Sequence, residues 1–234
     1  FSSVVEVAIG ADMGAIAEAH HYVEKVPGEL PFLLTSCCPS WSMVAKKFFP
    51  DVIDSISNEL TPMVATARTV KASHPNAKVA FIGPCTAKKL EASRKSVRSD
   101  VDFVVTFEEL MGMFVAKGVE FEETEEPSSF NEATGAGRGY GVAGGVAGAI
   151  EAVIREYYPE KEVLIDRAEG LADCTKLLKL AKAGKRNGYL IEGMGCPGGC
   201  VGGAGTIIPI NKANIAVDKF KKATPKAIPE KELV

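Results

Sequence analysis

The sequence has no long apolar run and no block of basic residues. A membrane-spanning helix needs about 18 or more consecutive, predominantly apolar residues, and no stretch of the chain reaches that length. The formal net charge is −3, whereas nucleic-acid-binding domains carry a basic patch or stripe. These absences predict a protein without a membrane span and without a nucleic-acid partner.

Cysteine is also scarce, with six among 234 residues. This density is too low for a small scaffold held together by disulfides. Five of the six lie in three loops rich in glycine and proline, and the adjacent Cys37 and Cys38 cannot pair with each other without strain. We therefore expect a reduced, cytoplasmic protein whose cysteines bind a metal centre. The chain begins with Phe1 rather than methionine, so we expect its natural N-terminus to lie upstream.

Glycine, by contrast, is concentrated around two of the cysteines. The stretch GMGCPGGCVGG at 193–203 places Cys196 and Cys200 among six glycines. Glycine permits positive φ and a close approach of the backbone to a bulky group, and thiolates favour iron–sulfur clusters, zinc and Cu(I). This loop is typical of a cluster-binding site. A redox-active thiol pair and a simple surface turn are the alternatives.

Strand and helix signals alternate along the chain. We expect strands at residues 1–9, 30–34, 78–82, 103–106, 162–165 and 189–191, with a turn at 10–12. We expect helices at residues 15–26, 40–49, 62–73, 107–117 and 171–183, and one that ends near residue 158. Thr61 before Pro62 is a predicted helix cap, and Thr106 with Glu109 is a capping-box signal. The lysine- and proline-rich tail after Ile210 is expected to wrap the surface.

This alternation predicts an α/β fold with parallel sheets and right-handed crossovers. The acidic stretch 119–132 is the best candidate for a linker, and it divides the chain into a first lobe at 1–130 and a second lobe at 131–234. Each of the three cysteine loops follows a predicted strand. Ligands of parallel sheets gather at the carboxyl ends of the strands, so we expect the three loops to form one site.

Three motifs resemble the three signatures of the [FeFe] hydrogenases. They are TSCCPSW at 35–41, PCTAKKLE at 84–91 and EGMGCPGGCVGG at 192–203, and the resemblance covers nearly the whole chain. It implies two lobes with mainly parallel sheets flanked by helices, and a site in the cleft between the lobes. It also implies the H-cluster, in which one cysteine joins a [4Fe–4S] cluster to a diiron unit bearing CO, cyanide and a bridging dithiolate.

The resemblance also implies a ligand set. By motif position, Cys38, Cys85, Cys196 and Cys200 hold the [4Fe–4S] cluster, and Cys200 bridges to the diiron unit. A [4Fe–4S] cluster needs four thiolates; the alternative is a structural four-cysteine zinc site, although such sites usually contain two close cysteine pairs. Cys174 falls within a predicted amphipathic helix, so we expect it outside the ligand set.

A proton path is implied in the same way. Cys37 corresponds to the family's proton-relay thiol, and a thiol with a pKa near about 8.5 can donate and accept protons at neutral pH when it has a partner. Glu18 aligns with the family's first carboxylate on this path, and Ser57 with the next hydroxyl. His21 stands where the family commonly has a second glutamate, and histidine can also pass protons. Without the resemblance, a solvated helix face is the better interpretation of Glu18 and His21.

Further residues match positions around the diiron unit. Lys88 matches the family's lysine that donates a hydrogen bond to a cyanide, which is a charge-assisted bond. Met194 matches a methionine packed beside the diiron unit, with core filling as the alternative. Glu91 and Glu192 match motif carboxylates and are expected to orient neighbouring groups.

The chain also departs from the family pattern. Gly83 replaces a methionine, Gly193 and Gly195 replace larger residues around Met194, and Tyr140 stands where phenylalanine is frequent. We expect these changes to open space and to alter polarity around the diiron unit. They indicate a divergent branch of the family.

The function implied by the resemblance is the reversible interconversion of H2 with protons and electrons. Ferredoxin or another soluble carrier would exchange the electrons, and maturation machinery would insert the diiron unit. One alternative is a hydrogen sensor with low turnover, motivated by Gly83 and Tyr140. Another is a hydrogenase-like iron–sulfur assembly factor that binds only a [4Fe–4S] cluster.

Overall fold

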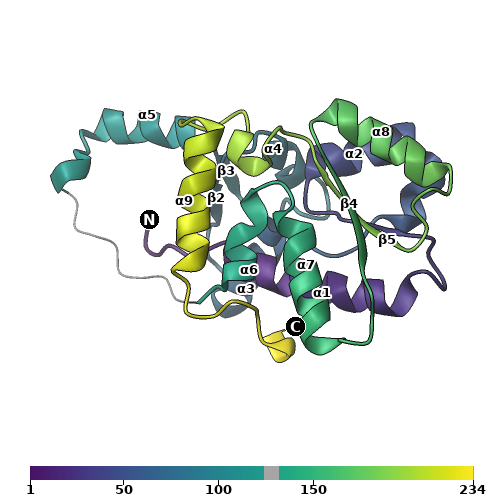
Figure 1. The fold of residues 1–234 in the computed structure, drawn as a ribbon. Helices are drawn as coiled ribbons and strands as arrows, with labels where there is room; N and C mark the ends of the chain where they lie inside the picture. Colours follow the sequence, from purple (N-terminus) through teal and green to yellow (C-terminus); the bar gives the residue numbers. More distant parts are fainter. Residues whose placement is uncertain (124–131, 234) are drawn as a thin grey trace.

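Two parallel sheets organise the structure, a computed structural model that describes residues 1–123 and 132–233. In the first sheet, β5 (Tyr189–Met194) lies between β1 (Leu33–Leu34) and β4 (Leu164–Glu169). The second sheet pairs β2 (Ala80–Ile82) with β3 (Phe103–Val105). Helices pack against both sheets (Figure 1), which confirms the predicted α/β class.

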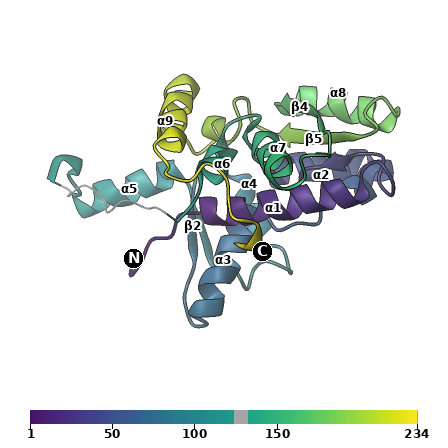
Figure 2. The same cartoon turned by 60° about the horizontal axis from the view of Figure 1, so that its bottom comes forward.

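The longest helix is α1 (Ala8–Lys25). The other helices are α2 (Pro39–Phe48), α3 (Pro62–Ser73), α4 (Ala87–Ala92), α5 (Phe107–Lys117), α6 (Gly135–Arg138), α7 (Gly145–Tyr157), α8 (Leu171–Lys182) and α9 (Ile210–Lys222). Both views place α2 and α8 with the first sheet on one side of the molecule, and α5 and α9 on the side of β2 (Figures 1 and 2). Helix α1 packs against α3, α6 and α7. No helix within residues 1–123 and 132–233 is long and apolar enough to cross a membrane.

The register of the first sheet brings two cysteine loops together. Leu34 pairs with Ile191 in parallel, so the segments after β1 and β5 leave the sheet at the same edge. The strand β1 comes from the first half of the chain and β5 from the second half. The first sheet therefore contains strands from both halves of the chain. The expected boundary between two lobes near residue 130 falls outside the described residues and stays a prediction.

The predicted N-terminal strand at 1–9 and the turn at 10–12 are wrong. Helix α1 begins at Ala8 and runs through both, and Val4 is 68% exposed. The alternation of apolar residues suggested a strand, but the small residues of α1 decide the outcome because they allow close helix packing. A Cβ on Gly10 would lie 2.4 Å from the carbonyl oxygen of Pro62 on α3.

Most other predicted elements are present, and the capping box is confirmed. Thr106 accepts the N–H of Glu109 at 3.2 Å, while the Glu109 carboxylate accepts the N–H of Thr106 at 2.8 Å. Helix α3 begins at Pro62 as predicted, but the hydroxyl of Thr61 donates to Glu91 at 2.9 Å instead of capping it.

The lysine- and proline-rich tail begins as a helix on the surface. Residues 210–222 form α9, in which Ala213 is buried and most other residues are exposed. The many lysines obscured the helical period in the sequence. Most of the predicted linker at 119–132 lies outside the described residues.

Candidate metal centre

Five of the six cysteines line one cavity of about 600 Å³. These are Cys37, Cys38, Cys85, Cys196 and Cys200. Lys88 and Met194 line the same cavity. The structure thus brings together the four predicted metal ligands and three of the other predicted site residues, from three loops far apart in sequence.

Each loop leaves the carboxyl end of a parallel strand. Cys38 immediately precedes α2, and its Sγ accepts the N–H of Gly195 at 3.3 Å. Cys85 follows β2, and the loop with Cys196 and Cys200 follows β5. The placement at strand ends is the one expected for ligand sites of parallel sheets.

Glycine is required at position 199, where the loop with Cys196 and Cys200 lies close to the backbone of residues 141–143. Gly199 has φ = +88°, and a Cβ there would lie 2.6 Å from the backbone nitrogen of Ala143. A side chain at this position would force the loop away from residues 141–143, and it would displace Cys200 with it. The glycines therefore hold the two thiols at the cavity wall.

The donor set fits a polynuclear group better than a single ion. Within residues 1–123 and 132–233, no three His, Cys, Asp or Glu side chains converge closely enough to hold one metal ion. Thiols that line a cavity at larger separations suit a cluster, in which each sulfur binds a different iron atom. Thiolate is also the ligand that such clusters prefer.

The cavity thiols belong to partly buried residues, and this burial affects their protonation. Burial raises the pKa of Cys200 to about 12, and the neighbouring thiols Cys38 and Cys85 add to the shift. Burial also raises the pKa of Cys196. Metal binding at these thiols therefore has to release protons.

Lys88 brings a buried positive charge to the cavity. Its Nζ donates to Glu91 at 2.7 Å and to the carbonyl oxygen of Cys37 at 3.3 Å. The other oxygen of Glu91 accepts the hydroxyl of Thr61, so the carboxylate is held from two sides. This pairing fixes the ammonium group at the wall, where it can donate to an anionic ligand.

Glu18 lies behind the first cysteine loop, with only 3% of its surface exposed. Its Oε1 accepts the backbone N–H of Ser36 at 3.3 Å, and the hydroxyl of Ser57 donates to the same carboxylate. Burial raises the pKa of Glu18 to about 7, partly offset by the hydrogen bonds from Ser57 and Ser36, while the charge of Glu59 adds to the rise. A carboxyl with this pKa can take up and release a proton near neutral pH.

Cys37 lines the cavity and is close enough to Glu18 for the carboxylate to affect its thiol. Burial raises the pKa of its thiol well above the usual value, and the charge of Glu18 adds to this effect. The thiol is therefore neutral and able to donate. His21 follows Glu18 on α1 and is partly exposed, whereas its neighbour His20 contacts Tyr158 and Glu24. The role of His21 stays a prediction.

Cys174 and Glu192 make hydrogen bonds that stabilise the fold. Cys174 lies inside α8 away from the cavity, and its thiol donates to the carbonyl oxygen of Met194 at 3.4 Å. Glu192 accepts the N–H groups of Gly144 and Ala147 at 2.6 and 2.7 Å, so it satisfies the N-terminus of α7.

The departures from the family pattern do not open the expected space. A Cβ on Gly83 would lie 2.7 Å from the ring of Phe81, and one on Gly193 would lie 2.0 Å from the ring of Trp41. The space beside these glycines is filled by aromatic rings. Phe81 lies only two residues before Gly83, whereas Trp41 comes from a distant segment whose approach to Gly193 the sequence could not reveal.

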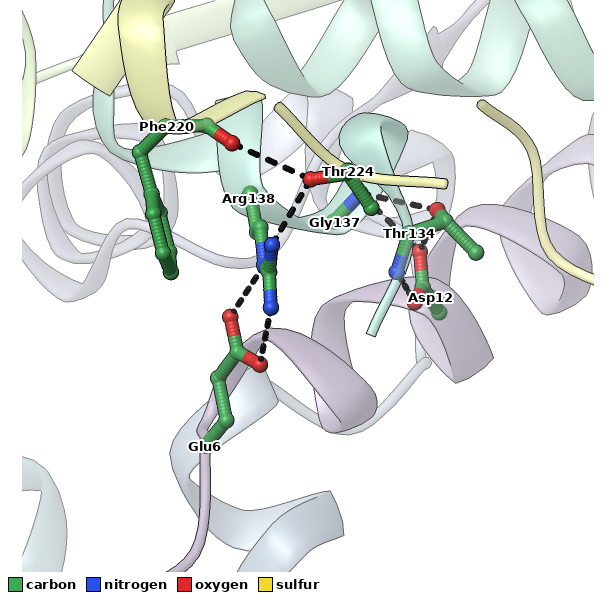
Figure 3. A network of polar contacts seen from close by, with 7 residues as sticks. All are labelled: Glu6, Asp12, Thr134, Gly137, Arg138, Phe220 and Thr224. Atoms are coloured by element: carbon green, nitrogen blue, oxygen red, sulfur yellow. Dashed lines mark hydrogen bonds and ion pairs between the residues drawn. The ribbon is translucent and has the colours of Figure 1, made fainter. Parts of the chain in front are cut away.

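The sequence analysis missed a buried ion pair beside the cavity (Figure 3). Arg138 donates to both oxygens of Glu6, at 2.6 and 3.0 Å, and to the hydroxyl of Thr224 at 2.8 Å. Its guanidinium also lies 4.0 Å from the ring centre of Phe220. This arginine therefore ties α6 to the N-terminal segment and to α9. Arg138 is the single charged residue in the glycine-rich segment 135–141, and this isolated charge could have indicated a buried ion pair.

Asp12 plays a similar role on α1. Its carboxylate accepts the N–H and hydroxyl of Thr134, at 2.7 and 2.6 Å, and the N–H of Gly137 at 2.9 Å (Figure 3). Asp12 therefore fixes the start of α6 on α1, which helps to position the glycine-rich segment at the cavity.

Comparison with known proteins places this architecture in a family. Residues 1–204 match the profile "Iron only hydrogenase large subunit, C-terminal domain". The chain is 28% identical to iron hydrogenase 1 of Clostridium pasteurianum over 88% of its length. It is 30% identical to an NADP-reducing hydrogenase subunit of Solidesulfovibrio fructosivorans, also over 88%. The chain spans only 43% of the length of each of these relatives.

Relatives named as iron–sulfur cluster assembly factors also match. A probable cytosolic Fe–S cluster assembly factor of Aedes aegypti is 25% identical over 99% of the chain and 60% of that protein. An apo [FeFe]-hydrogenase structure from Chlamydomonas reinhardtii shares the fold, with a TM-score of 0.76 and 22% identity over 99% of this chain and 77% of that one. The assembly-factor matches fit a divergent branch. Because the profile covers most of the sequence, this chain belongs to the iron-only hydrogenase large-subunit family.

Proposed function

We propose that this chain is the catalytic part of an [FeFe] hydrogenase, which interconverts H2 with two protons and two electrons. The observation that carries the proposal is the cavity that five thiols share with Lys88, together with the buried Glu18 behind it. A site that only stores or passes on an iron–sulfur cluster needs four thiolates. The fifth thiol and the buried carboxyl are then left over, and proton transfer accounts for both.

The residues fit the H-cluster as follows. Cys38, Cys85, Cys196 and Cys200 would hold the [4Fe–4S] cluster, and Cys200 would also hold the diiron unit with its CO, cyanide and dithiolate ligands. When bound, this group supplies the redox chemistry of H–H bond formation and cleavage. Lys88 would donate to a cyanide from its fixed position on Glu91.

The protein's own part is to move protons and to exclude water. Cys37 would carry a proton at its Sγ, and Glu18 would carry the next one at its carboxyl group. Ser57, which donates to Glu18, would continue the path outward. Met194 is 2% exposed and, together with the apolar residues of the cavity, would keep bulk water from the site.

The partners follow from this assignment. Protons and H2 would be the substrates, and ferredoxin or another soluble carrier would exchange electrons with the [4Fe–4S] cluster. Dedicated maturation machinery would supply the diiron unit. We propose a cytoplasmic location, in line with the reduced thiols.

The second candidate is an iron–sulfur assembly factor that binds only the [4Fe–4S] cluster. It is favoured by the assembly-factor relative that matches over 99% of the chain. A hydrogen sensor with low turnover is a third candidate, but the ring of Phe81 beside Gly83 weakens one of its two motivations.

Infrared spectroscopy of anaerobically matured protein separates these candidates. Hydrogenase and sensor should both carry CO and cyanide bands, and only the hydrogenase should evolve H2 rapidly. A protein with four irons and without these bands after maturation would be the assembly factor.

A further inference from the structure

The backbone of Gly198, midway between Cys196 and Cys200, is held by two separate segments of the chain. The Glu169 carboxylate accepts its N–H, with 2.8 Å between Oε2 and nitrogen. Its carbonyl oxygen accepts the N–H of Ala143 at 3.0 Å. Both polar groups of this residue therefore have partners outside the loop, and the segment that joins the two proposed ligands is fixed from two sides.

Glu169 contacts the loop from the end of β4. In the register of the first sheet, Glu169 pairs with Met194 of β5, and the N–H of Gly170 donates to the carbonyl oxygen of Met194 at 2.9 Å. Gly170 has φ = +75°, and the chain turns there into α8. The last residue of β4 is thereby fixed beside the start of the loop, and its carboxylate reaches Gly198.

The carboxylate of Glu169 is exposed to solvent and carries a negative charge at neutral pH. Among the residues that the structure describes, no lysine, arginine or histidine forms an ion pair with it. The buried carboxylates of the site differ in this respect, since Glu91 is paired with Lys88 at 2.7 Å and Glu192 accepts two N–H groups. Glu169 therefore adds a negative charge without a cationic partner next to the loop.

A negative charge at this place affects how readily a bound cluster is reduced. One-electron reduction of a [4Fe–4S] cluster adds a negative charge to a group that already has four thiolate ligands. The Glu169 carboxylate contacts a residue two positions from each of Cys196 and Cys200, so it lies within about one Debye length of both. Coulomb repulsion between the carboxylate and the added electron disfavours reduction.

We propose that Glu169 is a positioning residue of the metal centre, which holds Gly198 between two cluster ligands and whose negative charge lowers the reduction potential of the [4Fe–4S] cluster. Its hydrogen bond would hold the loop with Cys196 and Cys200 against the cluster. No bond or proton changes at Glu169, and the electron comes from the soluble carrier of the proposed function. This inference rests on the proposed function, of which it needs the [4Fe–4S] cluster alone.

Glu169→Gln tests the effect of the charge, in the full chain with a reconstituted [4Fe–4S] cluster and without the diiron unit. The glutamine oxygen can still accept the N–H of Gly198, so the loop should stay in place. The ratio of reduced to oxidised cluster at the wild-type midpoint potential should rise by about two- to fivefold. This is a positive shift of about 20 to 40 mV, at about 59 mV per tenfold change. A redox titration followed by electron paramagnetic resonance measures it.

Glu160→Gln is the matched control for the charge. Glu160 is also exposed, but it precedes β4 and so lies towards the opposite edge of the first sheet. This variant changes the net charge equally and should leave the potential unchanged, because distance and salt screen the charge. An unchanged potential in Glu169→Gln, or an equal shift in both variants, would overturn the proposal.

Glu169→Ala tests the positioning, because it removes the acceptor of the Gly198 N–H together with the charge. Losing a contact that supports a metal ligand typically weakens metal binding by about 10- to 100-fold. A chelator should therefore remove iron from the alanine variant about tenfold faster than from the wild type, whereas Glu169→Gln should release iron at the wild-type rate. A folded alanine variant that releases iron as slowly as the wild type would contradict the positioning role.

These readouts use the [4Fe–4S] cluster and do not depend on hydrogen turnover. Missing CO and cyanide bands after maturation would refute the proposed hydrogenase and leave the effects of Glu169 intact. A wild-type chain that binds no [4Fe–4S] cluster would overturn both the proposed function and the role of Glu169.

Discussion

The carboxylate of Glu18 on α1 accepts a hydrogen bond from the backbone N–H of Ser36, with 3.3 Å between Oε1 and nitrogen. Ser36 directly precedes Cys37, so this bond connects the central helix to the first cysteine loop. The buried carboxyl and the buried thiol are thereby held on adjacent segments.

Cys37→Ala should remove the proton donor while leaving the four metal ligands in place. We expect the infrared bands of the matured protein to persist and H2 evolution to fall by about 10² to 10⁴-fold. Cys174→Ala is the control, because this thiol lies in α8 outside the cavity. Turnover in Cys37→Ala close to that of the control would remove Cys37 from the mechanism.

Cys200→Ala should remove the bridge to the diiron unit. We expect CO and cyanide bands to be missing after maturation, because the remaining cysteines cannot supply that bond. Iron content and infrared spectra of the variant are the measurements. Persistent bands of normal intensity would contradict the assignment of Cys200 as the bridge.

Glu18 should make the folding stability depend on pH. Its pKa is raised from the usual 4.5 to about 7, so the folded state retains a proton that the unfolded state has lost between these values. The free energy of unfolding should therefore fall as pH rises through this window, by roughly 3 kcal/mol in total. In Glu18→Gln this component should be absent. Urea unfolding of both proteins at about pH 5 and pH 8 measures the difference, and equal pH dependence would refute the raised pKa.

Glu6→Ala should remove the two hydrogen bonds that the buried guanidinium of Arg138 donates to the Glu6 carboxylate. The Arg138 side chain is 3% exposed, so we expect the free energy of unfolding to fall by about 3 to 5 kcal/mol. Asp173→Ala is the control, since Asp173 and Lys176 form an exposed pair that is worth no more than about 1 kcal/mol. Similar losses in the two variants would mean that the buried pair does not stabilise this corner of the fold.

Gly193→Ala should destabilise the protein strongly, because the added Cβ would lie 2.0 Å from the ring of Trp41. We expect a loss of about 1 to 3 kcal/mol or more from overpacking. Gly148→Ala, on α7 with nothing within 4 Å of the added Cβ, should instead gain about 0.5 to 1 kcal/mol from helix propensity. Thermal unfolding of the two variants in parallel checks the contrast, which would fail if both changed stability in the same direction.

Local signals in the sequence predicted much of the fold. The Thr106 capping box, the proline that opens α3, and the short apolar strands before each cysteine loop all depend on residues close in the chain. The N-terminal strand failed for the opposite reason. The apolar residues before Ala8 favoured a strand, but the segment that follows is a helix because its small residues fit against α3, α6 and α7.

The sequence by itself determined the chemistry that is available: five thiols in three loops, each loop placed after a strand, with glycines where the backbone must come close. Motifs and strand order are enough for this, since parallel strands deliver their loops to one edge. Only the tertiary structure decided which groups meet. Arg138 reaches Glu6, and Thr134 reaches Asp12, across more than a hundred residues of chain, and such contacts depend on how the helices pack rather than on any local pattern.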